Sequence, residues 1–282
     1  MQRSKGFKTL QYIFALLITL FTLGPFVWMF ITSISVSEEL RQVPLDWIPD
    51  TITWQRYLDI LISNKNEMAY TFRVAMFNTL QVAGLVTLLA LVCGGVAAYA
   101  FARLKFKFRQ NLIYLFLFTY MIPPVVIVLP LYLMLSSLNM LDSKMSLVLL
   151  NATFIIPFVI WIMQSYFGSI SKDFEEAAAI DGCNRFQLLW HVIVPIARPG
   201  FIATGILAFL MSWEEFFYAL LFTSSLDAKT ISVAIAEFSG RHLTDYGMTA
   251  AGGVVASIPP VVIAIIFQKY LVKGMSGGGV KE

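Results

Sequence analysis

Long stretches without charge recur along the chain, separated by short segments that carry most of its Asp, Glu, Lys and Arg. Five such stretches are free of charge: residues 9–37, 74–102, 110–141, 145–171 and 246–268. About 20 apolar residues are enough for a helix to cross the hydrocarbon core of a bilayer. The pattern therefore predicts membrane spans at residues 10–34, 74–102, 112–136, 145–168 and 247–268. Pro123 and Pro124 lie inside the third of them and should break its helix.

A sixth apolar stretch, residues 200–223, has the right length for a span but contains Glu214 and Glu215. Residues 199–213 and 216–226 on either side carry no charge, so we expect a span here as well. Six spans also return both ends of the chain to one side of the membrane. The predicted fold is all-α: one integral membrane domain, residues 1–282, with six transmembrane helices.

The composition agrees with lipid as the main solvent. The chain is 58% hydrophobic and 13% charged, with a mean hydropathy of +0.76, whereas soluble domains are about 25% charged. A net charge of +3 is too small to predict nucleic-acid binding. Cys93 and Cys183 lie far apart, which gives neither a metal-ligand spacing nor a disulfide framework.

The distribution of basic residues predicts the orientation. If the amino terminus is cytoplasmic, the inner segments hold 13 of the 20 Lys and Arg residues, including four between Arg103 and Arg109. Cytoplasmic loops are enriched in Lys and Arg, so we expect both termini inside. Residues 35–73 then form an outer loop and residues 169–199 a cytoplasmic one. The first apolar stretch is too long for a signal peptide and lacks a cleavage site of small residues, so it should remain as an anchor.

The cytoplasmic loop, residues 169–199, has the features of a short helix followed by a tight turn. Asp173 followed by Glu176 is an N-terminal capping pattern, and the alanines 177–179 favour helix. Gly182 can adopt the left-handed conformation that ends a helix. We therefore expect one short helix that ends at Gly182.

A second short helix should follow the turn. Asn184 and Gln187 have the spacing of a capping box, and the helix should end before Pro195. The three alanines of the first helix leave a low, smooth face that suits insertion into a groove on a partner. Considered alone, an alanine-rich loop helix is more often only a loop helix.

The spacing of this loop resembles the coupling-loop signature of bacterial ABC importer permeases. That signature has Glu-Ala-Ala, then Gly, then Ile-x-Leu-Pro; here it corresponds to residues 176–178, Gly182 and residues 192–195, with valine at both aliphatic positions. Residues 97–106 and 212–223 and the Gly-Gly-Val-Lys ending resemble the carbohydrate-uptake branch, in particular its smaller maltose-type subunit. The likeness extends from about residue 70 to the end of the chain.

The resemblance implies a permease subunit of an ATP-driven, binding-protein-dependent importer in the bacterial inner membrane, for a sugar, oligosaccharide or polyol. Its partners would be a dimeric cytoplasmic ATPase, a second homologous permease and an extracytoplasmic solute-binding protein. The ATPase would bind ATP and Mg, so this chain itself would hold no cofactor, metal or catalytic residue. The chain indeed lacks the Gly-x-x-x-x-Gly-Lys-Ser/Thr loop of such ATPases.

The same resemblance assigns residues to the ATPase contact. The coupling set comprises Glu175, Glu176, Ala177, Ala178, Ala179, Asp181, Gly182 and Arg185. The tail residues Gly278, Gly279, Val280 and Lys281 would lie near the ATPase interface.

The acids in the fifth span are candidates for substrate contact. An acid at the centre of a membrane helix costs about 2.5–3.5 kcal/mol, so it usually faces a cavity or a partner. We expect a substrate pathway lined by Trp213, Glu214, Glu215, Phe217 and Tyr218, because carboxylates and aromatic rings suit sugars. A hydrogen bond that only packs helices together is an equal alternative. The family usually has Asn where this chain has Glu214, which puts the typical substrate preference in doubt.

An ion-coupled carrier or channel that works without an ATPase is the alternative function. His191 and His242 are the only histidines, and we expect them on opposite sides of the membrane, so they form no proton relay or catalytic set. An inverted-repeat carrier is also usually longer than this chain.

Overall fold

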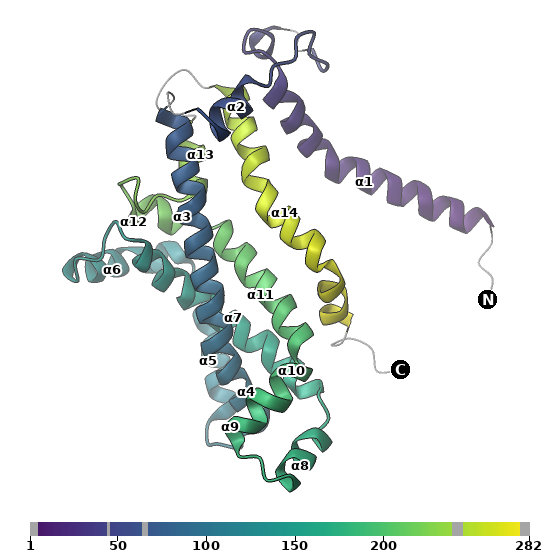
Figure 1. Ribbon diagram of the computed structural model, residues 1–282, viewed down its shortest axis with the longest axis vertical. Helices are drawn as coiled ribbons and strands as arrows, with labels where there is room; N and C mark the ends of the chain where they lie inside the picture. The colour runs from purple at the N-terminus through teal and green to yellow at the C-terminus, as the bar shows by residue number, and fades with distance from the viewer. Residues whose placement is uncertain (1–4, 44–45, 64–66, 239–244, 277–282) are drawn as a thin grey trace. The chain divides into compact units, whose positions relative to one another are not determined.

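The computed structural model describes residues 5–43, 46–63, 67–238 and 245–276, and within these ranges it contains helices and no strand (Figure 1). The all-α prediction is therefore confirmed. The helices group into two compact units: one comprises the chain up to Arg73 together with Ala234–Ile258, and the other comprises Val74–Val233 and the chain from Pro259 onward.

Four helical stretches are long and apolar enough to cross a membrane: Gly6–Ile34, Glu67–Arg103, Lys144–Ser169 and Tyr246–Tyr270. The first, third and fourth correspond to α1 (Lys5–Ile34), α7 (Lys144–Ser169) and α14 (Tyr246–Ser276). The second comprises α3 (Glu67–Leu89), a π-helical turn (Ala90–Gly94) and α4 (Gly95–Arg103). Two bent pairs, Arg109–Met121 with Pro124–Ser137 and Arg185–Ile196 with Arg198–Trp213, raise the total for the described residues to six if each pair is one span. The predicted six-span arrangement is compatible with this pattern.

The third span is broken where its prolines predict. Its two halves, α5 (Arg109–Met121) and α6 (Pro124–Ser137), meet at an angle of 92°. Ile122 is extended, with φ −71° and ψ 121°, because a residue before proline is pushed out of the helical region. Pro123 and Pro124 also lack the N–H groups that a continuous helix would use.

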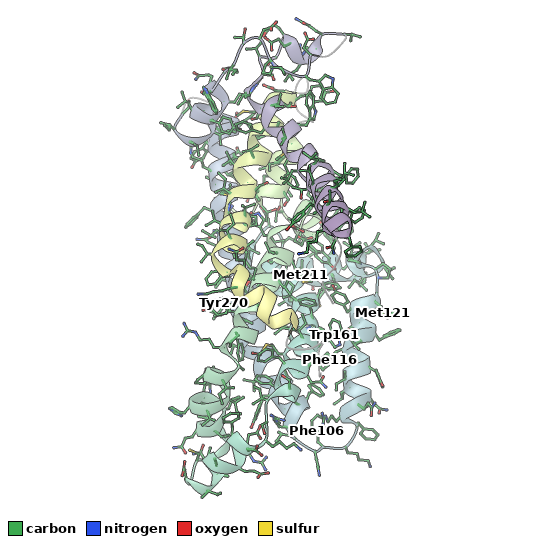
Figure 2. All side chains as sticks on the ribbon, turned by 90° about the vertical axis from the view of Figure 1, so that its right-hand side faces the viewer. Phe106, Phe116, Met121, Trp161, Met211 and Tyr270 are labelled. Carbon is green, nitrogen blue, oxygen red and sulfur yellow. The ribbon has the colours of Figure 1, made fainter. Side chains whose placement is uncertain are left out.

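The second unit is built around α7, whose buried residues pack against α4, α5 and α11 (Arg198–Trp213). Two glycines permit this close packing. A Cβ added to Gly94 would lie 2.8 Å from Val159, and one added to Gly95 would lie 2.7 Å from Phe201. Phe101 of α4 also meets Phe116 of α5 edge to face, with ring centroids 5.8 Å apart; Figure 2 labels Phe116.

The remaining short helices connect these elements. They are η1 (Glu39–Arg41), α2 (Gln55–Leu61), α8 (Asp173–Ile180), α9 (Arg185–Gln187), α10 (Val194–Ile196), α12 (Phe217–Phe222) and α13 (Ile231–Glu237). Within the second unit, α8 and α9 lie together at one end, while α6 and α12 lie towards the other (Figure 1).

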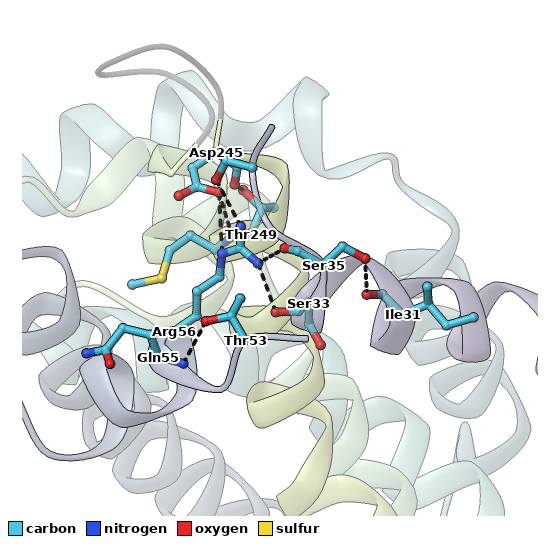
Figure 3. A network of polar contacts seen from close by, with 10 residues as sticks. Ile31, Ser33, Ser35, Thr53, Gln55, Arg56, Asp245 and Thr249 are labelled. Carbon is cyan, nitrogen blue, oxygen red and sulfur yellow. Dashed lines mark hydrogen bonds and ion pairs between the residues drawn. The ribbon is translucent and has the colours of Figure 1, made fainter. Parts of the chain in front are cut away.

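A buried arginine organises the first unit (Figure 3). The side chain of Arg56 on α2 donates hydrogen bonds to the carbonyl oxygens of Ser33 and Ser35, the former at 3.1 Å. Its Nε lies 3.8 Å from Oδ1 of Asp245. A Cβ added to Gly247 would lie 2.1 Å from the guanidinium carbon of Arg56. The arginine thus holds the end of α1 and the start of α14 against α2.

Candidate functional site

The helix pair after α7 begins with α8, whose N-cap is Lys172. The prediction that Asp173 caps this helix is wrong. Asp173 is the first residue inside the helix, and its own N–H donates to Oγ of Ser171 at 3.3 Å. Together with Glu175 and Glu176 it places three acids in the first turn, where they favour the helix through its dipole.

The turn after α8 forms as the sequence predicts. Gly182 has a φ of +83°, and the N–H of Cys183 donates to the carbonyl oxygen of Ala178 at 3.0 Å, which closes the helix end. A Cβ at Gly182 would meet nothing within 4 Å. Glycine is therefore required here by the backbone conformation and not by lack of space.

The second helix of the pair starts as predicted but continues further. Asn184 and Gln187 form the expected capping box, with hydrogen bonds of 2.9 and 3.0 Å. The helix then passes through a π-helical turn, Leu188–Ile193, into α10. The prediction that it ends before Pro195 is wrong. The wider π turn accommodates the proline, which cannot donate the regular backbone hydrogen bond.

The helix pair exposes large apolar side chains beside its alanines. Phe174 and Ile180 of α8 are 50% and 87% exposed, and Phe186 and Trp190 of the second helix are 69% and 44% exposed. Of the predicted coupling residues, those with exposed positions are Glu176, Ala177, Ala179, Asp181, Gly182 and Arg185, while Ala178 is buried. A group of exposed apolar side chains outside the long spans is typical of a protein contact surface.

Glu175, the remaining member of the predicted set, contacts its own chain. It forms an ion pair with Nε of Arg103, the last residue of α4; the two side chains are 18% and 7% exposed. Nη2 of Arg103 also donates to the carbonyl oxygen of Ile170 at 2.6 Å, just after α7. This arginine therefore joins α4, α7 and α8. In the sequence, Arg103 contributes only to the basic bias that predicts the orientation, and no local pattern points to its distant partner.

The fifth span is interrupted at its acids. The continuous helix predicted over residues 200–223 is wrong, because α11 ends at Trp213 and α12 begins at Phe217. The carboxylate of Glu215 accepts hydrogen bonds from the N–H groups of Tyr218 at 2.7 Å and Ala219 at 3.1 Å. The first N–H groups of a helix have no partner within it, so this side chain stabilises a new helix start.

The side chains around this break differ in exposure. Trp213 and Tyr218 are buried, and they stack on Phe209 and Phe154 with ring centroids 5.5 and 5.7 Å apart. Phe217 and Glu215 are half-buried, and Glu214 is exposed. Of the five residues predicted to line a substrate pathway, Glu214 alone is exposed, and the pathway itself stays a prediction.

Two buried hydroxyl groups flank the same break. Within the described part of the chain, Oγ of Ser212 and the hydroxyl of Tyr218 have no hydrogen-bond partner. Such groups normally bond to protein or water. Both hydroxyls lie within the packed side chains around the break, so they are not exposed to a substrate.

Asp142 fixes the far end of α12. Its Oδ1 accepts hydrogen bonds from the N–H groups of Ser224 at 2.8 Å and Ser225 at 2.9 Å, and its own N–H donates to the carbonyl oxygen of Phe222 at 2.9 Å. Burial alone would raise the pKa of Asp142, but these hydrogen bonds outweigh it and hold the pKa below its ordinary value. The loop before α7 is thereby tied to the segment after α12.

Five residues named in the sequence predictions cannot be placed. Gly278, Gly279, Val280, Lys281 and His242 lie outside the described residues. In the part that is described, no three His, Cys, Asp or Glu side chains converge on a position that could hold a metal ion.

Comparison with known proteins gives a consistent result. The family model described as "Binding-protein-dependent transport system inner membrane component" matches residues 90–277. The sulfoquinovosyl glycerol transport system permease protein SmoH of Agrobacterium fabrum is 34% identical over 97% of this chain and 94% of its own length. The trehalose/maltose transport system permease protein MalG of Thermococcus litoralis is 32% identical over 97% of both chains.

The fold also matches a solved structure. A chain from the crystal structure of a bacterial ABC transporter involved in the import of the acidic polysaccharide alginate superimposes with a TM-score of 0.76, covering 96% of this chain and 99% of that one. The two sequences are 24% identical, so this likeness establishes the shared architecture.

Proposed function

This chain belongs to the family of binding-protein-dependent transport system inner membrane components, and we propose that it forms, with a second permease, the pore through which an ATP-driven importer moves a carbohydrate. It is a multi-pass inner membrane permease and not an ion-coupled carrier. Its task is translocation, while ATP and Mg are bound and ATP is hydrolysed by a separate dimeric subunit. Both termini and the loop between α7 and α11 face the cytoplasm.

The exposed pair α8 and α9 is the observation that carries the ATPase assignment. A short helix with exposed alanines and two large apolar side chains, Phe174 and Ile180, fits a hydrophobic groove on a partner. The turn at Gly182 sets the direction of the second helix, whose Phe186 and Trp190 extend the same kind of surface. Movement of the docked helix pair is transmitted to the membrane spans by Arg103. It is also transmitted along the chain from α9 through α10 to α11. The tail residues 278–281 contribute to the same interface.

A sugar, an oligosaccharide or a polyol is the proposed substrate. The relatives named above transport sulfoquinovosyl glycerol and trehalose or maltose, which supports this class. At the break between α11 and α12, the exposed carboxylate of Glu214 offers hydrogen bonds to substrate hydroxyl groups. A broken helix in a membrane is tolerated where it is buried in protein or lines a water-filled cavity.

The two carboxylates at the break are expected to respond differently to substitution. Glu215→Ala should lower the free energy of unfolding by about 1–2 kcal/mol, the usual cost of a lost helix cap, because two N–H groups of α12 lose their acceptor. Glu214→Gln should leave unfolding unchanged and raise the half-saturation concentration for uptake by about tenfold. Thermal unfolding in detergent and transport assays measure the two effects. An unchanged half-saturation concentration would exclude Glu214 from substrate contact.

Affinity purification tests the whole proposal. The chain carries a tag, is extracted from its native membrane in mild detergent, and its companions are identified by mass spectrometry. An ATPase and a second permease should copurify in fixed proportion, and an extracytoplasmic binding protein should stimulate ATP hydrolysis. A chain that purifies alone and performs ion-driven uptake in vesicles would refute the importer assignment.

A further inference from the structure

Lys144, the first residue of α7, is held in a fixed position beside α3. Its Nζ donates hydrogen bonds to Oε1 of Gln81 at 2.8 Å and to Oδ1 of Asn78 at 3.3 Å. The amide nitrogen of Asn78 in turn donates to the carbonyl oxygens of Leu226 at 2.9 Å and Lys229 at 3.0 Å. Both of its amide hydrogens are thus engaged, and its oxygen is directed at the ammonium group.

The charge of Lys144 is not neutralised within the described part of the chain. No carboxylate there forms an ion pair with it, and its two acceptors are neutral amides. The amino-terminal end of α7, a helix of 26 residues, adds the partial positive charge of the helix dipole. The position therefore favours an anion.

This ammonium group lines a groove whose other lining residues, apart from Gln81, are apolar. The cavity has a volume of about 610 Å³ and is lined by Lys144, Leu80, Gln81, Gly84, Leu85 and Leu88. Leu80, Leu85 and Leu88 are 46%, 49% and 61% exposed. From Leu80 to Leu88 the groove follows α3 for about 12 Å, at 1.5 Å per residue. It lies beside the start of α7 and along the middle part of the apolar stretch Glu67–Arg103.

The lining discriminates between possible anions. A sugar, even an acidic one, needs several hydrogen-bonding groups and commonly an aromatic face, but this groove offers one amide, one ammonium group and no aromatic ring. A phosphate attached to hydrocarbon matches it better. We propose that this groove binds an anionic phospholipid, with the phosphodiester on Lys144 and the upper part of an acyl chain along Leu85 and Leu88.

Native mass spectrometry tests this on the complex purified through a tag on this chain, after incubation with phosphatidylglycerol or phosphatidylcholine. The unaltered complex should retain phosphatidylglycerol preferentially. Lys144→Gln should reduce its retention about fivefold, the factor that one basic residue contributes near an anionic membrane surface. Lys144→Arg should keep the preference, and Lys172→Gln, at an exposed position on α8's N-cap, is the control.

A second variant fills the groove without disturbing the fold. A Cβ at Gly84 meets nothing within 4 Å, so Gly84→Leu should fold normally and lose bound phosphatidylglycerol. Unchanged retention in both Lys144→Gln and Gly84→Leu would overturn the proposal. So would displacement of the lipid by soluble glycerol phosphate, which would indicate a site for a free anion, or crosslinking of the groove at Leu85 to a second permease. Lipid retention requires no transport, so failure here leaves the importer function untouched.

Discussion

Replacing Gly182 by valine is expected to reduce uptake at least about tenfold while the amount of chain in the membrane stays within about twofold. A residue with a Cβ, above all a β-branched one, is strained at a φ of +83° by about 1–3 kcal/mol, and about 1.4 kcal/mol corresponds to a factor of ten. The added atoms meet nothing within 4 Å, so the whole effect comes from the backbone. The turn should open and misdirect α9 relative to α8.

A substitution series separates this mechanism from a steric one. Asparagine tolerates the left-handed conformation, so Gly182→Asn should retain most of the uptake, with alanine intermediate and valine lowest. Gly168→Val is the matched control, since Gly168 is an exposed helical residue in α7 with open space around it. Uptake and ATP hydrolysis by the purified complex are measured together. Full transport by Gly182→Val would contradict the coupling role of this turn.

Removing either member of the Arg103–Glu175 pair is expected to be the most destabilising single change outside the spans' apolar core. The partner left behind is a largely buried charge, and breaking such a pair costs about 3–5 kcal/mol. Arg103→Ala also removes the hydrogen bond to the carbonyl oxygen of Ile170, so its melting temperature should fall more than that of Glu175→Ala. Both variants should lose uptake, because α8 is no longer held to α4.

The charge-swapped double variant, Arg103→Glu with Glu175→Arg, distinguishes the ion pair from simple packing. It should recover part of the stability and uptake that the single Arg103→Glu variant loses. Recovery should be incomplete, since a glutamate at position 103 cannot donate to Ile170. Lys105→Ala, an exposed basic residue two positions further on, should behave like the unaltered chain. No recovery in the double variant would show that charge pairing is not what joins α4 and α8.

Features that depend on local chemistry could be predicted from the amino-acid sequence alone. The uncharged stretches define the apolar spans, because a charge that faces lipid is costly. Pro123 and Pro124 break the third span because they lack the donors that a helix needs. Gly182 and the capping box at Asn184 followed from residues within a few positions of one another. The proline, glycine and capping residues act on backbone groups a few positions away, so their effect depends little on how the helices pack.

Other features were missed although the residues concerned are close in sequence. Glu215 lies three and four positions before the N–H groups it binds, but a capping role requires that the helix stop at Trp213, and the apolar pattern continues past it. Pro195 was expected to end a helix, and a π-helical turn before it allowed the chain to continue. In both places the sequence favours two alternatives, a helix that continues and a helix that ends, and tertiary packing determines which one forms.

Contacts between distant polar groups could not be predicted and become visible only in the folded chain. Nothing near Arg103 in the sequence indicates that its partners are Glu175 and Ile170, and nothing near Lys144 indicates Asn78 and Gln81. The close approach to α7 at Gly94, in the π-helical turn before α4, likewise has no local signature. The hydrophobic pattern and the composition of a segment predict that it forms a membrane-spanning helix. Which face of such a helix packs against which neighbouring helix depends on the side-chain contacts of the whole unit. These contacts form only when the chain folds.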